Sequence, residues 1–192
     1  MKLPEPIPVT LLVIEALEAL GVPYFLGGSL ASSVHGVLRT TKDADVVADL
    51  RLKHVQPLAR ALSDAFYVDA ESIKDAIRHQ SSFNVIHLET MFKVDVFILK
   101  GRPFDAAQFG RRATQVIATD PERCAYVASA EDTILAKLEW YRKGGEVSEQ
   151  QWRDVLGVLK VQGDRLDYGY LRHWAVQLSV ADLLERALSE VG

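Results

Sequence analysis

Short runs of β-branched and aromatic residues dominate the first two thirds of the chain and predict strands. Tyr24–Leu26 predicts a short buried strand, and Asp43–Ala48 predicts a second one, in which Val46 and Val47 indicate burial on both faces. Residues 82–88 and 92–99 each alternate between apolar and polar positions, and the short segment between them predicts an antiparallel hairpin. Weaker strand patterns cover 113–118 and 124–127.

Apolar residues recur at helical spacing in the remaining segments, and the predicted helices end at glycine or begin at serine. The helix predicted over 9–20 ends before Gly21, and the one over 129–142 begins at Ser129 with acidic residues in its first turn. Further helices are predicted over these ranges: 29–35, 54–65, 71–78, 148–160, 168–178 and 180–191.

This order of elements predicts an α+β protein, with a mixed sheet flanked by helices and a C-terminal helical bundle. The strands all fall before residue 128, and everything after Ser129 is helical in pattern. We therefore predict an α/β core over residues 1–128 and a helical part over residues 129–192 that packs on the core.

Composition narrows the function classes only slightly. The 192 residues carry a net charge of −4, so overall charge gives no reason to expect nucleic-acid binding, although a local basic groove is compatible with it. No apolar run approaches the roughly 20 residues that span a bilayer, and we expect no membrane association and a cytoplasmic location. The single Cys124 has no partner for an internal disulfide and lies in an apolar run, where we expect it to be buried.

The candidate chemistry lies in two motifs separated by one short helix. Gly27-Gly28-Ser29 forms a tight glycine turn, which can bring backbone N–H groups close to a phosphate. Asp43 and Asp45 are two residues apart on a predicted strand, so both carboxylates point to the same face. A phosphate-binding turn beside a pair of carboxylates predicts chemistry on a nucleoside triphosphate.

Asp95 adds a third carboxylate. It lies within the apolar strand pattern of residues 92–98, where an unpaired carboxylate would be costly. Carboxylates from two adjacent strands offer the oxygen ligands that Mg²⁺ prefers. We therefore predict that Asp43, Asp45 and Asp95 share divalent cations, Mg²⁺ or Mn²⁺.

The run FLGGSLASSVHGVLRTTKDADVV, residues 25–47, resembles the active-site signature of the polymerase-β-like nucleotidyltransferase superfamily. With His35, Gly36, Arg39 and Thr41 before the aspartates, it looks like the AbiEii-type toxin branch and its uncharacterised bacterial relatives. Those toxins carry a lysine on one C-terminal helix and an acidic residue on the next. Lys137 and Arg153-Asp154 match that pattern, and the resemblance covers most of residues 24–160.

The resemblance implies a role for each matching residue. Gly27, Gly28, Ser29 and Arg39 would bind the nucleotide; Asp43, Asp45 and Asp95 would bind metal; Asp95, Lys137 and Asp154 would be catalytic. Lys137 would lie against the phosphates, and Asp154 would either orient it or assist proton removal. An ordinary salt bridge between neighbouring helices is the alternative for Lys137 and Asp154.

The reaction implied is attack of an acceptor hydroxyl on the α-phosphorus of a nucleoside triphosphate, with pyrophosphate leaving. RNA, such as tRNA, or a protein hydroxyl would be the acceptor, and a cognate antitoxin is the expected partner if the protein is the toxin of a toxin–antitoxin pair. The alternative is a nucleotide-binding or protein-interaction module that keeps this fold without turnover.

Overall fold

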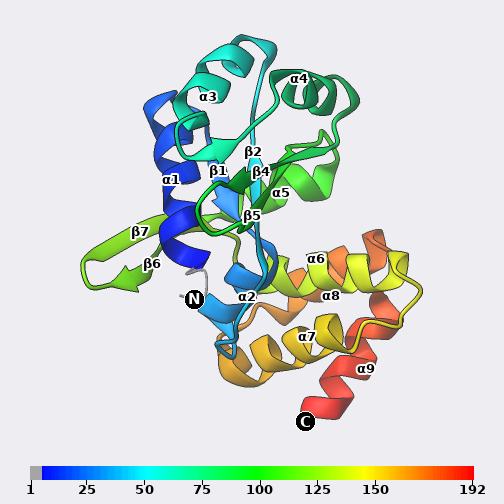
Figure 1. Cartoon of the computed structure of the whole chain (residues 1–192). Coiled ribbons are helices and arrows are strands. Elements are labelled where there is room, and N and C mark those ends of the chain that lie inside the picture. The colour runs from blue at the N-terminus through cyan, green and yellow to red at the C-terminus, as the bar shows by residue number, and fades with distance from the viewer. Residues whose placement is uncertain (1–5) are drawn as a thin grey trace. The chain divides into compact units, whose positions relative to one another are not determined.

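The computed structural model describes residues 6–192, so the start of the predicted core, residues 1–5, lies outside the described residues (Figure 1). The elements follow one another in this order: α1 (Pro6–Ala19), β1 (Tyr24–Leu26), α2 (Gly28–His35), β2 (Asp43–Ala48), η1 (Leu52–His54), α3 (Val55–Leu62), β3 (Phe66–Tyr67), α4 (Ala70–His79), β4 (Ser82–His87), β5 (Lys93–Ile98), α5 (Pro103–Arg111), β6 (Ala113–Thr119), β7 (Glu122–Val127), α6 (Ala130–Lys143), α7 (Glu149–Gln162), η2 (Gly163–Arg165), α8 (Tyr168–Gln177) and α9 (Ala181–Val191).

The chain forms two compact units. The first unit consists of the described residues up to Gly27 together with Thr41–Val127. The second unit consists of Gly28–Thr40 together with Ala128–Gly192. Helix α2 thus belongs to the same unit as the C-terminal helices, whereas the boundary expected at residue 128 left it with the N-terminal part. No helix among residues 6–192 combines the length and hydrophobicity that crossing a bilayer requires.

The first unit is built on a seven-stranded mixed sheet with strand order β3-β4-β5-β2-β1-β7-β6. The central pair β2–β5 is parallel, as is β1–β7, and β4–β5 is the antiparallel hairpin that the alternating pattern predicts. Helix α1 contacts α3 and β2, and α4 contacts β4 and β5. Phe109 of α5 packs edge-on against Phe25 of β1, with ring centroids 6.0 Å apart.

Strand β2 is buried on one face only. Ala44, Val46 and Ala48 are buried, whereas Asp43, Asp45 and Val47 are half-exposed on the opposite face. The expected burial of Val47 on a second covered face is therefore wrong, because that face carries the carboxylates. Cys124 is exposed, which corrects the expectation of burial: on β7 the neighbouring Ala125 turns inward.

The second unit is helical, with α2 packed against α6 and α7, and α6 against α7 and α8 (Figure 1). Its helix starts follow from capping: Ser129 Oγ accepts a hydrogen bond from the Asp132 N–H, and Ser148 caps α7 in the same way. Gly36, just after α2, lies close to α7; a Cβ built there would be 3.0 Å from the Val158 nitrogen. Glycine therefore permits this close approach of the two backbones.

Candidate active site

The glycine turn joins the sheet to α2. The Gly27 N–H donates to the Asp45 carbonyl over 3.0 Å, so this N–H extends the β1–β2 ladder and is committed to the sheet. Gly28 has a φ of +54°, a conformation that glycine adopts without a steric penalty, and it opens α2. Ser29 follows in the first turn of α2, at the helix end where backbone N–H groups and the helix dipole favour anions.

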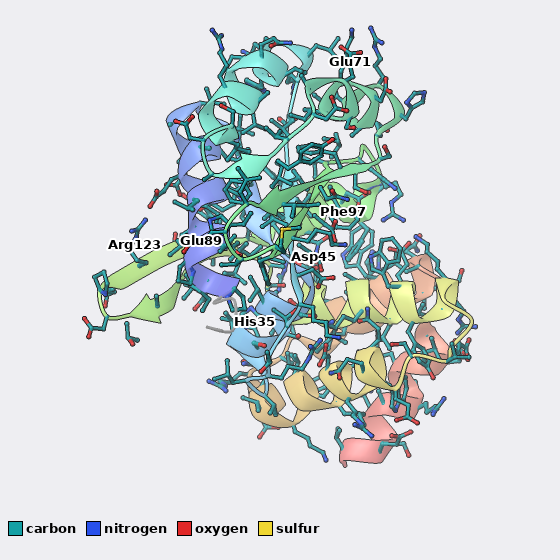
Figure 2. All side chains as sticks on the ribbon, viewed as in Figure 1. His35, Asp45, Glu71, Glu89, Phe97 and Arg123 are labelled. Atoms are coloured by element: carbon teal, nitrogen blue, oxygen red, sulfur yellow. The ribbon has the colours of Figure 1, made fainter. Side chains whose placement is uncertain are left out.

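Asp43, Asp45 and Asp95 lie on one face of the pair β2–β5, as their spacing predicts. Asp45 is directly opposite Asp95 in the parallel register, and Asp43 is opposite Lys93. Figure 2 labels Asp45 and Phe97 on these two strands. We call Asp43, Asp45, Asp95 and Lys93 together the carboxylate face.

Lys93 is the residue of this face that the sequence argument missed. Its Nζ lies 2.8 Å from Asp95 Oδ2, which supplies the partner that a carboxylate in an apolar strand needs. The hydrogen bond to Asp95 raises the pKa of Lys93, and the charges of Asp95, Asp43 and Asp45 raise it further against the opposing effect of burial. Period-two spacing was the available signal, because it places Lys93 on the same face as Asp95.

The chemistry of the carboxylate face suits a divalent cation. Carboxylate oxygens are the ligands that Mg²⁺ and Mn²⁺ prefer, and three of them lie on one face of two adjacent strands. Among residues 6–192, no group of three or more His, Cys, Asp and Glu side chains is arranged so that it could hold a metal ion as it stands. In this structure the positive charge beside Asp95 is the Lys93 ammonium.

A second set of predicted residues meets in the helical unit. The Arg39 guanidinium donates to both carboxylate oxygens of Asp154, each over 2.9 Å, and its Nη2 also donates to Ser29 Oγ over 2.7 Å. Such bidentate arginine–carboxylate pairs are strong and fix orientation. Lys137 Nζ lies 2.9 Å from Asp154 Oδ2. We call Ser29, Arg39, Lys137 and Asp154 the Asp154 cluster.

The cluster is largely buried and fully hydrogen-bonded. The side chains of Lys137 and Asp154 are 5% and 7% exposed, and Lys137 also donates to Gln151 Oε1 over 2.9 Å. Burial is the largest single influence on Asp154 and raises its pKa, but the hydrogen bonds and charges of Arg39 and Lys137 outweigh it, so the pKa lies below its ordinary value of 3.8. Asp154 is therefore an anion that two cations hold in place.

His35 connects three segments of the helical unit through its ring and its backbone carbonyl. Its Nε2 is 2.6 Å from the Ala128 carbonyl oxygen, and its own carbonyl accepts a hydrogen bond from Gln162 Nε2. These contacts tie the end of α2 to the segment before α6 and to the end of α7. We interpret His35 as a residue that positions α2.

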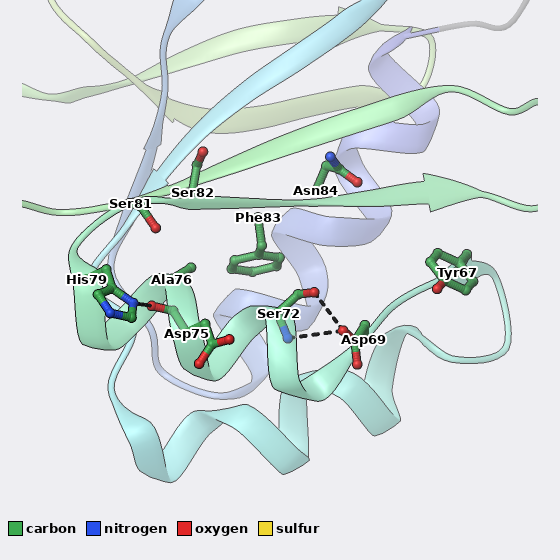
Figure 3. Close-up of a pocket in the computed structure, with 10 residues that line it drawn as sticks. All are labelled: Tyr67, Asp69, Ser72, Asp75, Ala76, His79, Ser81, Ser82, Phe83 and Asn84. Carbon is green, nitrogen blue, oxygen red and sulfur yellow. Dashed lines mark hydrogen bonds between the residues drawn. The ribbon is translucent and has the colours of Figure 1, made fainter.

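A pocket of about 470 Å³ lies between α4 and β4; one of its lining residues, Asn84, is opposite Asp95 in the β4–β5 register (Figure 3). It is lined by Tyr67, Asp69, Ser72, Asp75, Ala76, His79, Ser81, Ser82, Phe83 and Asn84. Asp69 is the N-cap of α4 and accepts hydrogen bonds from Ser72, so its carboxylate is engaged in the helix start. In Figure 3 Phe83 points toward α4, while Ser82 and Asn84 point to the other side of the strand.

Comparison of the sequence with protein-family models and with curated proteins gives no match. Solved structures do match. The lincosamide antibiotic adenylyltransferase LnuA, bound to lincomycin, has a TM-score of 0.51 at 16% identity over 84% of this chain and 99% of its own. The antibiotic-resistance factor ANT(2″)-Ia has a TM-score of 0.59 at 9% identity over 93% of this chain and 96% of its own.

An antigenic nucleotidyltransferase-like protein from Paracoccidioides brasiliensis has a TM-score of 0.53 at 18% identity, over 90% of each chain. At these identities the likeness is one of fold. It confirms the predicted α+β nucleotidyltransferase fold, a mixed sheet with helices, which the motif at residues 25–47 indicates from the sequence alone.

Proposed function

We propose that this chain is a metal-dependent nucleotidyltransferase that moves a nucleoside monophosphate from a nucleoside triphosphate to an acceptor hydroxyl. The Asp154 cluster is the observation that carries the proposal. Ser29 and Arg39 come from the N-terminal motif and Lys137 and Asp154 from the C-terminal one, yet all four side chains are joined by hydrogen bonds and ion pairs. The adenylyltransferases among the structural neighbours support the same class of reaction.

In this proposal the helical unit binds the triphosphate. Gly28 and Ser29 form the start of α2, where free backbone N–H groups favour anions. The Gly27 N–H already donates to the Asp45 carbonyl, so Gly27 would contribute the shape of the turn and no hydrogen bond to the phosphate. Arg39 and Lys137 supply positive charge for the phosphate oxygens. Their charge matters most as pyrophosphate leaves, because negative charge then grows on the leaving oxygen.

The carboxylate face would hold Mg²⁺ or Mn²⁺ through Asp43, Asp45 and Asp95. When bound, such ions neutralise charge on the entering and leaving oxygens. Asp95 would accept the proton of the acceptor hydroxyl, whose oxygen forms a new bond to the α-phosphorus as the bond from that phosphorus to the pyrophosphate oxygen breaks. The protein needs no covalent nucleophile, because positioning and charge neutralisation carry the reaction.

We propose that Asp154 is a positioning residue, which is the first of the two roles that the resemblance implies. Its Oδ1 accepts from Arg39 and from Gln150 Nε2, and its Oδ2 accepts from Arg39 and faces Lys137. A carboxylate held this way is a poor proton acceptor, since its lowered pKa favours the charged form. The Asp154→Asn variant should therefore lower transfer without shifting the pH at which the rate rises.

The acceptor is proposed from the resemblance to AbiEii-type toxins, which makes an RNA hydroxyl, such as one of tRNA, the first candidate and a protein hydroxyl the second. A cognate antitoxin would be the partner in that setting. Among the structural neighbours, LnuA is a lincosamide antibiotic adenylyltransferase, and ANT(2″)-Ia was solved with adenylyl-2″-tobramycin. An antibiotic-like hydroxyl is therefore the third acceptor to test.

The test is transfer of label from each of the four α-labelled nucleoside triphosphates, with Mg²⁺ or Mn²⁺, to total RNA, to the protein itself or to a panel of aminoglycosides and lincosamides. We expect labelled product with one nucleotide and one acceptor class, and a roughly 10²–10³-fold lower rate of transfer with Asp45→Asn. Absence of both label transfer and pyrophosphate release in every combination would contradict the proposal.

A nucleotide-binding module without turnover is the second candidate, and the Lys93–Asp95 ion pair favours it because it engages a carboxylate that the reaction requires. Calorimetry separates the two functions. Tight nucleotide binding with no pyrophosphate release supports the silent module, whereas binding accompanied by turnover supports the enzyme.

A further inference from the structure

Lys93 occupies a defined place among the three carboxylates. The parallel register puts its Cα opposite that of Asp43 and one pleat away from the Asp45–Asp95 pair, and its Nζ reaches Asp95 Oδ2 at 2.8 Å. Its side chain is 41% exposed and that of Asp95 20%, so the pair is partly screened by solvent. Lys93 thus places a positive charge beside the three carboxylates.

A cation already present on this face changes what a second cation experiences. The ammonium neutralises part of the negative charge that would attract a divalent ion, and it competes directly for an oxygen of Asp95. Like charges within a few ångströms repel, so an ion that enters must either displace the ammonium or bind beside it at a lower affinity. Without an ion, the same ammonium reduces repulsion between Asp95 and its aspartate neighbours.

We propose that Lys93 is a positioning residue that holds Asp95 in the metal-free protein and competes with divalent cations for it, thereby setting the metal affinity of the carboxylate face. This inference rests on the proposed function, because it takes the carboxylate face to be the metal site. A merely structural salt bridge would affect stability and leave metal affinity unchanged.

The experiment is a titration of the nucleotide-free full chain with Mn²⁺, followed by the paramagnetic resonance of the free ion and by calorimetry. Lys93→Met removes the charge and keeps a side chain of similar length; Lys93→Gln is a second neutral variant. We expect both to bind Mn²⁺ roughly tenfold more tightly than the unaltered chain. Lys93→Arg keeps the charge, so its affinity should stay within about twofold.

Lys53→Met is the matched control, because Lys53 is exposed in η1 and its loss changes the net charge by the same amount. Its Mn²⁺ affinity should stay within about twofold of the unaltered chain. Far-UV circular dichroism and melting curves confirm that each variant is folded. Unchanged or weaker binding by both neutral Lys93 variants, or equal tightening by Lys53→Met, would overturn the proposal.

Asp45→Asn separates this inference from the function on which it rests. If Asp45→Asn loses Mn²⁺ binding while Lys93→Met binds like the unaltered chain, the role of Lys93 is refuted and the metal site stands. If the unaltered chain and Asp45→Asn bind Mn²⁺ equally, or if neither binds, the carboxylate face is not a metal site and both proposals fall.

Discussion

The carboxylate face and the Asp154 cluster are both charged sites, but they manage their charge differently. On the face, Lys93 pairs with Asp95 beside Asp43 and Asp45, and all four residues are partly exposed on the surface of the sheet. In the cluster, one buried carboxylate is held by two cations and two glutamines provide further hydrogen bonds. The face gathers carboxylates, which attract cations, whereas the cluster gathers two cations around one carboxylate, and cations attract anions.

The comparison also concerns stability. Removing one partner of a buried ion pair leaves a charge without compensation, which is strongly destabilising. Removing a carboxylate from a surface rich in carboxylates relieves repulsion instead. We therefore expect substitutions in the face to affect activity far more than stability, and substitutions in the cluster to affect both.

The largest effect is expected for Asp45→Asn. Nucleotidyl transfer should fall roughly 10²–10³-fold, since a charged ligand aimed at the reaction is lost. The melting temperature should stay within a few degrees. Label transfer and differential scanning fluorimetry measure the two quantities.

Asp49→Asn is the matched control, since Asp49 follows β2 directly and pairs with Arg51 at the surface. Its transfer rate should stay within about twofold of the unaltered chain. If Asp45→Asn loses no more activity than Asp49→Asn, the expectation that the carboxylate face is needed for activity would be contradicted.

The next largest effect is expected for Lys137→Met, which removes one of the two cations bound to the buried Asp154 and leaves Arg39. The free energy of unfolding should fall by about 2–3 kcal/mol, near the lower end for a broken buried pair. Urea denaturation measures it. Lys143→Met on the same helix removes an exposed ammonium that pairs with Glu139 and lies over the Trp140 ring, and it should cost about 1 kcal/mol or less.

Gly36→Ala tests the backbone approach that aligns α2 with α7. A Cβ at this position would lie 2.9 Å from the Ser32 oxygen and 3.0 Å from the Val158 nitrogen, both backbone atoms that cannot move aside cheaply. We expect a loss of about 1–2 kcal/mol of unfolding free energy. Gly110→Ala, which has open space around its Cβ within α5, should be neutral or slightly stabilising.

The smallest effect is expected in the acid dependence of stability. The pKa of Asp154 is lowered on folding, so its contribution is present above the ordinary value of 3.8 and is lost as the pH falls through the lower folded value. The unaltered chain should therefore lose more stability between pH 5 and about pH 3 than Asp154→Asn does. Parallel acid titration curves for the two proteins would contradict this assignment.

Much of the fold could be predicted because its signals are local. The β-branched run after Asp45, the alternation around Asp95, the serine caps at Ser129 and Ser148 and the glycine ends predicted strands and helices close to those observed. Helix α5 and the short β3 were missed. Strand β3 has two residues and exists only through its pairing with β4, which no local pattern reveals.

The sequence predicted which residues belong to the candidate site but not which of their side chains contact one another. The motif around Gly28 and Asp45 and the later Lys137 and Asp154 were identified from residue type and order. Lys93 was not among the predicted residues, although its spacing of two from Asp95 places both side chains on the same face of the strand.

By itself the sequence determined most of the elements, the glycine turn into α2 and the placing of Asp43 and Asp45 on one face of a strand, since these depend on backbone propensity and on the period of two. Only the tertiary structure decided that Arg39 binds Asp154, which lies 115 residues further along the chain. The same holds for the ion pair that Lys93 forms with Asp95. Pairings of this kind depend on which strands and helices become neighbours, and that is settled by packing across the whole unit and not by any local stretch of residues.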